Sequence, residues 1–91
     1  MNTLNNKMSK DEIYIWVVDM LHEMFELEKS KITPQSNLYT ELDIDSIDAV
    51  DIVVKMNQIT GKRLNPDVFR AVRTVQDVVN VLAQLLAEEA K

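Results

Sequence analysis

Apolar side chains recur at helical spacing in three separate stretches of the chain. In residues 10–27 they fall three or four positions apart, which predicts one helix with a broad buried stripe. That stripe comprises Ile13, Trp16, Val17, Met20, Leu21, Met24 and Leu27. The last stretch, from residue 74 toward residue 88, has a second stripe of Val75, Val78, Val79, Leu82, Leu85 and Leu86. Capping-box patterns, Ser9 with Glu12 and Thr74 with Asp77, open both stretches, so a first and a last helix are expected.

The helical spacing is interrupted between residues 28 and 45. Pro34 and Asn37 mark turns there. Ile32, Leu38 and Leu42 are spaced irregularly, as expected of apolar side chains that anchor a long loop on a core. Long ordered loops in small domains are usually functional.

A middle helix is predicted to begin at Asp45-Ser46 and to run to about Thr60, where Gly61 supplies a stop. Asn65-Pro66 then starts a short helix over residues 67–72. The element order predicts an all-α four-helix bundle with a long first loop and a short third helix. We expect residues 1–8 to be a flexible lead-in, residues 9–88 to form the bundle and residues 89–91 to be a tail.

The middle helix has two apolar stripes. One is the expected core stripe, formed by Ala49, Ile52, Val53, Met56 and Ile59. The other, Ile47, Val50 and Val54, begins roughly 60° beyond Val53 on a helical wheel, so the apolar arc is about two-thirds of the circumference. Either this helix is unusually buried, or the second stripe is a partner-binding surface framed by Asp48, Asp51 and Lys55.

The net charge of -5 is concentrated on one segment. Five acids fall within eleven residues that contain no Lys or Arg: Glu41, Asp43, Asp45, Asp48 and Asp51. Acids and bases balance in the rest of the chain. The negative electrostatic potential of such an acidic segment disfavours nucleic acid as a ligand and favours a partner with a basic patch. A merely solvated acidic face is the alternative.

Several classes of site are disfavoured by composition. The absence of cysteine excludes disulfides and thiolate metal sites. No secretion signal or membrane-spanning run is present, so we expect a soluble, cytoplasmic protein. A calcium loop from Asp43 would place Asp48 where glycine is required and Val54 where glutamate is required. A serine hydrolase would need a base near Ser46, whereas the sole histidine, His22, is expected to be solvated. We therefore expect neither a metal site nor an enzyme.

Ser46 lies where the long loop becomes the middle helix. Uncommitted backbone N–H groups and the helix dipole suit that position for a covalently attached phosphate. The alternative, which position alone favours, is that Asp45 or Ser46 is only an N-cap. Residues 41–53 resemble the attachment motif of the acyl carrier protein family, an Asp-Ser-Leu or Asp-Ser-Ile core followed by an acidic, apolar-striped helix. Residues 32–38 and 74–77 are similar to other parts of bacterial carriers, so the resemblance extends over about residues 9–87.

The resemblance implies that a phosphopantetheinyl transferase attaches 4′-phosphopantetheine from coenzyme A to Ser46. The arm would hold acyl groups as thioesters and deliver them to fatty-acid, polyketide or polyene-type synthase enzymes with basic docking patches. The family pattern implies partner docking through Asp45, Ile47, Asp48, Val50, Asp51 and Val54. We expect a monomer. The alternative is a non-carrier helical adaptor that binds a basic partner through the same helix.

Two departures from the family pattern affect these expectations. The glycine usually found two residues before Asp45 is Asp43 here, which is expected to adopt a positive φ. The bases Lys55, Lys62, Arg63, Arg70 and Arg73 face only Asp67 between residues 55 and 76, unlike the acidic surface typical of fatty-acid carriers. A dedicated secondary pathway is therefore as compatible as housekeeping synthesis. The lack of paired glycines before the serine disfavours a peptidyl carrier.

Overall fold

The computed structural model describes residues 8–61, 63, 67 and 70–88. It contains helices α1 (Lys10–Phe25), α2 (Ser46–Thr60) and α4 (Val75–Glu88), and the short 3-10 helix η1 (Lys29–Lys31). The described part has no strand, only an isolated bridge between Asn37 and Thr74. The all-α class is confirmed, whereas the short helix predicted over residues 67–72 lies largely outside the described residues. No described helix has the length and apolar character needed to span a bilayer.

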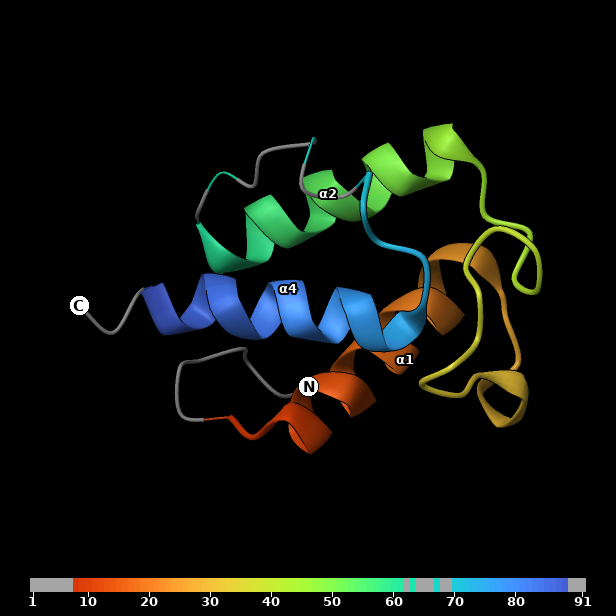
Figure 1. Cartoon of the computed structure of the whole chain (residues 1–91), viewed down its shortest axis with the longest axis horizontal. Coiled ribbons are helices and arrows are strands. Elements are labelled where there is room, and N and C mark those ends of the chain that lie inside the picture. Colours follow the sequence, from red (N-terminus) through yellow and green to blue (C-terminus); the bar gives the residue numbers. More distant parts are fainter. Residues whose placement is uncertain (1–7, 62, 64–66, 68–69, 89–91) are drawn as a thin grey trace.

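The core is built from the apolar stripes of all three helices. α4 packs against α1 and lies between α1 and α2 in the view of Figure 1. Every residue predicted for the α4 stripe is buried, as are the first five predicted for α1. The side chains with the least exposure include Val17, Leu21, Ile52, Met56, Val79 and Leu82. The helical spacing of the sequence thus identified most of the core.

α1 ends two residues earlier than its apolar pattern predicts. Glu26 adopts a left-handed conformation with φ 57°, and its N–H donates to the carbonyl of His22 at 2.9 Å. This left-handed residue closes the helix after Phe25. Met24 and Leu27, both predicted for the buried stripe, are only half-buried at the edge of the core, and Leu27 lies beyond the end of the helix.

The long loop is fixed to the core and to the start of α4. Ile32, Leu38 and Leu42 are buried, as predicted. The N–H of Leu38 donates to the carbonyl of Arg73 at 2.8 Å, and the N–H of Val75 donates to the carbonyl of Ser36 at 3.1 Å. Backbone hydrogen bonds between segments this distant in sequence give the loop a defined path to α2.

Candidate functional site

The start of α2 is closed by two aspartates. Asp45 is the N-cap: its Oδ1 accepts the N–H of Asp48 at 2.8 Å, while Asp48 Oδ2 accepts the N–H of Asp45 at 3.4 Å. Ser46 is therefore the first residue of the helix and does not cap it. Of the two N-cap candidates, Asp45 is therefore the N-cap and Ser46 is not.

The Ser46 side chain has no structural task in the described part of the molecule. The residue is exposed, and its hydroxyl makes no hydrogen bond with any described residue. The backbone N–H groups of Ser46 and Ile47 likewise have no acceptor among those residues. An anion joined to this hydroxyl would meet free N–H donors and the positive end of the α2 dipole. The residues present thus fit a phosphodiester on Ser46.

The segment that leads into Ser46 is anchored to the core by the residue two positions before the serine. Ile44 is buried, and its N–H donates to the carbonyl of Leu38 at 2.9 Å. Asp43, directly before it, has φ 56°, which confirms the positive φ predicted for this position. Aspartate tolerates the left-handed region better than most residues, so the chain turns here without glycine. Ile44 was not singled out from the sequence, although its buried side chain anchors the approach to the site.

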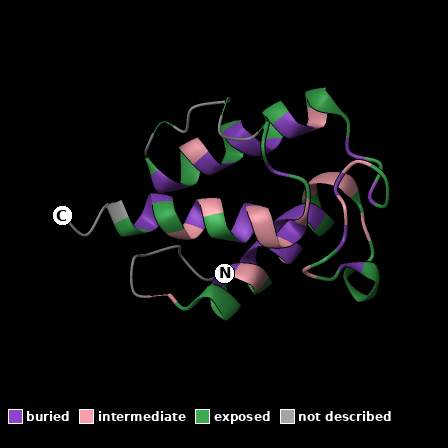
Figure 2. Cartoon of the chain, viewed as in Figure 1, coloured by how far each residue is buried: buried purple, intermediate pink, exposed green. Residues whose placement is uncertain are grey.

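α2 leaves its second apolar stripe in solvent. Ile47 is 72% exposed, Val50 57% and Val54 46%. The alternative of an unusually buried helix is therefore wrong. Buried and exposed positions alternate along the α2 ribbon in Figure 2. Asp45 and Asp51 are also exposed and Asp48 is half-buried, so the predicted docking residues do share one accessible helix.

The core stripe of α2 differs from the prediction at its last turn. Ile59 is 36% exposed, whereas Thr60 is buried. On a helical wheel Thr60 lies near the middle of the buried stripe, whereas Ile59 lies near its edge, about 20° from the buried Ile52. The Thr60 hydroxyl donates to the carbonyl of Met56 at 2.8 Å, which satisfies its polar group inside the core.

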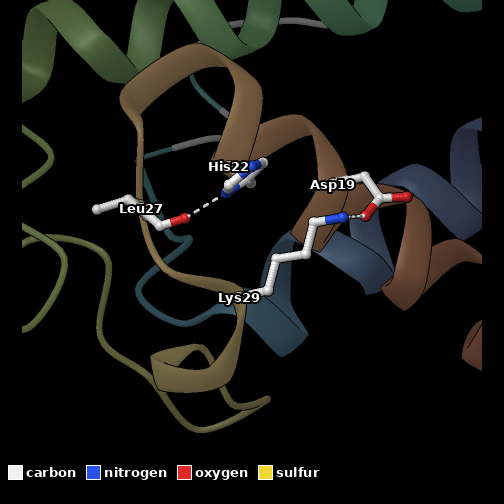
Figure 3. A network of polar contacts seen from close by, with 4 residues as sticks. All are labelled: Asp19, His22, Leu27 and Lys29. Atoms are coloured by element: carbon white, nitrogen blue, oxygen red, sulfur yellow. Dashed lines mark hydrogen bonds and ion pairs between the residues drawn. The ribbon is translucent and has the colours of Figure 1, made fainter.

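His22 is part of a separate polar network at the end of α1 (Figure 3). Its Nδ1 lies 2.8 Å from the carbonyl oxygen of Leu27, and Lys29 Nζ lies 2.6 Å from Asp19 Oδ1. His22 is exposed, as expected, and in addition its contact with Leu27 ties the last turn of α1 to the loop. No group of three or more potential metal ligands occurs among the described residues.

Comparisons with known proteins place these features in context. A model of the family described as "Phosphopantetheine attachment site" matches residues 16–82. The chain is 41% identical to "Acyl carrier protein 2" of Ralstonia nicotianae over 80 residues, which are 88% of this chain and 99% of that protein. It is 32% identical to "Acyl carrier protein" of Lactobacillus acidophilus, over 82% of this chain and 94% of that protein. It is also 31% identical to "Meromycolate extension acyl carrier protein" of Mycobacterium leprae, over 89% of this chain and 70% of that protein.

Proposed function

This chain belongs to the acyl carrier protein family and carries acyl groups on 4′-phosphopantetheine, and we propose that Ser46 is the residue to which this arm is attached. The observation that supports the assignment is the free, exposed Ser46 hydroxyl at the first position of α2. The exposed face of α2 suits a carrier and an adaptor equally, and the family match favours the carrier.

In the attachment step, the residues of this chain present and orient the nucleophile. Ser46 Oγ attacks the phosphorus that bears the pantetheine in coenzyme A, so the Oγ–P bond forms while the bond from phosphorus to the departing adenosine bisphosphate breaks. We assign the hydroxyl proton to a base of the transferase. When bound, the arm supplies a thiol that holds the acyl group as a thioester. Asp45, as the N-cap, and Ile44, as a buried anchor, fix the backbone next to Ser46.

The experiment that tests the site is intact mass before and after incubation with coenzyme A, Mg²⁺ and a broad-specificity phosphopantetheinyl transferase. The unmodified chain is expected to gain one phosphopantetheine unit and Ser46→Ala none. Because Asp45 holds the cap, Ser46→Ala should retain the helical circular dichroism signal of the native chain. Ser30→Ala, at another exposed serine, is the matched control and should load fully. Loading of Ser46→Ala would contradict the assignment.

We further propose that synthase enzymes with basic patches dock on α2, with Ile47, Val50 and Val54 as the apolar contact. Substitution of Asp51 tests the contribution of acidic side chains to docking better than substitution of Asp48, because Asp48 also forms the capping box of α2. Asp51→Lys should slow loading by a basic transferase roughly tenfold at low salt, with less effect at high salt. Equal loading rates for Asp51→Lys and the native chain would contradict this role.

The finer architecture and the pathway are also proposals. A short third helix over residues 67–72 would complete the four-helix bundle. The Arg70 N–H, which donates to the Asp67 carbonyl at 3.2 Å, supports this helix.

We propose fatty-acid, polyketide or polyene-type synthases as the enzymes to which this carrier delivers acyl groups. The names of the relatives are compatible with lipid synthesis, and the base-rich region after residue 54 suits a dedicated partner set.

A further inference from the structure

A charged stripe runs beside the exposed apolar stripe of α2, and its sign changes along the helix. Asp48, Asp51 and Lys55 stand at positions i, i+3 and i+7, the same spacing as Ile47, Val50 and Val54. The two stripes are therefore parallel neighbours offset by one residue. With a rise of about 1.5 Å per residue, the acidic end lies roughly 10 Å from the cationic end.

The cationic end is not neutralised within the described part of the structure. Lys55 is exposed and forms no ion pair with any described residue, even though Asp51 stands at the i-4 position that permits one. Arg63, two residues beyond the Gly61 C-cap of α2, is also exposed and unpaired among those residues. The positive sign thus continues past the end of the helix.

From this arrangement we infer that the docking surface of α2 is bipolar. It selects a protein partner whose apolar contact is flanked by basic groups and, about 10 Å further along, by a carboxylate that meets Lys55. A partner with basic groups along its whole length would place a like charge against Lys55. A partner docked in the reverse direction would meet repulsion at both ends. The sign change therefore fixes both the direction of docking and the class of partner.

The inference deepens the proposed docking role but does not depend on the phosphopantetheine arm, because it concerns only the surface of the folded chain. A result against it would leave the mass-based assignment of Ser46 intact. A failure to load Ser46 would likewise leave the bipolar surface unaffected.

The test uses two synthetic amphipathic helical peptides with the same apolar ridge. One has lysines along its whole charged flank, and the other has lysines on one half and glutamates on the other. Binding to the full chain is followed by nuclear magnetic resonance titration at low salt. The lysine–glutamate peptide is expected to bind about threefold more tightly. Net charge alone predicts the opposite order, since a chain of net charge -5 attracts the all-lysine peptide more strongly.

Lys55→Glu should reverse this preference, with the all-lysine peptide becoming the tighter ligand. Lys31→Glu is the matched control: it alters net charge equally, at an exposed lysine on η1, and should leave the preference unchanged. The expected shifts lie on Ile47, Val50, Val54 and their α2 neighbours. Tighter binding of the all-lysine peptide to the native chain, an equal reversal by Lys31→Glu, shifts confined to α1 or no binding of either peptide would each overturn the inference.

Discussion

α2 and α4 are helices of nearly equal length, 15 and 14 residues, that use their apolar side chains differently. In α4 the whole predicted stripe is buried, from Val75 to Leu86. In α2 one stripe lies in the core, while Ile47, Val50 and Val54 remain in solvent beside Ser46. Partly exposed apolar side chains contribute less to the stability of the isolated chain than fully buried ones do. α4 thus gives its whole apolar stripe to the core, whereas α2 gives only one of its two stripes, and the second, exposed stripe is available for the docking role proposed above.

The largest expected effect comes from the same substitution made in each helix. Val79 is fully buried in α4 and Val54 is 46% exposed in α2. Val79→Ala should lower the free energy of unfolding by about 2 kcal/mol, because it removes two buried methyl groups and leaves a cavity. Val54→Ala should alter it by less than about 0.5 kcal/mol. Urea unfolding followed by circular dichroism measures both, and equal losses would show that Val54 supports the fold as much as a core residue does, which would contradict the contrast between the two helices.

The same contrast explains which parts of the fold were predictable from sequence. The α4 stripe, the capping boxes and the Gly61 stop depend on local spacing and on residue types with strong positional preferences, and the structure bears them out. The end of α1 was not predictable, because Glu26 gives no sequence signal for a left-handed residue. The choice between Ile59 and Thr60 was missed for another reason. Polarity favoured isoleucine as the core residue, but Thr60 lies near the middle of the buried stripe, and its hydrogen bond to the Met56 carbonyl satisfies the buried hydroxyl.

For the candidate site, the sequence located Ser46 but left its structural role open. Aspartate and serine are both good N-caps, so the motif alone could not say which of Asp45 and Ser46 closes the helix. The bond from Asp48 N–H to Asp45 Oδ1 decides it. The contact of Ile44 with the long loop and the bond of His22 to Leu27 depend on where the chain reverses. Neither leaves a local pattern in the sequence.

A smaller effect is expected from the acids that open the two helices. The backbone N–H groups of Arg73 and Thr74 donate to Asp77 Oδ2 at 3.0 and 3.1 Å and lower the pKa of this carboxyl below its ordinary value. At the same position of α2, Asp48 receives one longer bond, at 3.4 Å. Asp77→Asn should therefore cost about 1 kcal/mol at neutral pH and Asp48→Asn less.

The pH dependence sharpens that prediction. Because the folded state lowers the pKa of Asp77, the stabilisation is present above the ordinary aspartate pKa of about 4 and is lost as the pH falls through the lowered value. Urea unfolding between pH 6 and pH 2.5 should show the native chain and Asp77→Asn converging as the pH falls. A constant difference over that range would mean that the charge of Asp77 plays no part.

The smallest expected effect concerns the acidic face itself, and its sign is opposite. Asp51 is exposed, forms no ion pair with the described residues and lies in a segment of five acids without a base. Asp51→Asn should therefore raise the free energy of unfolding by up to about 0.5 kcal/mol at low salt, by relieving like-charge repulsion. Asp19→Asn is the matched control in α1, because Asp19 is paired with Lys29 and its replacement should lower stability slightly or leave it unchanged. Both effects should fade above roughly 0.5 M salt, where the Debye length falls to a few ångströms. A loss of stability in Asp51→Asn would show that the acidic face of α2 supports the fold, and the contrast with α4 would then rest on the apolar stripe alone.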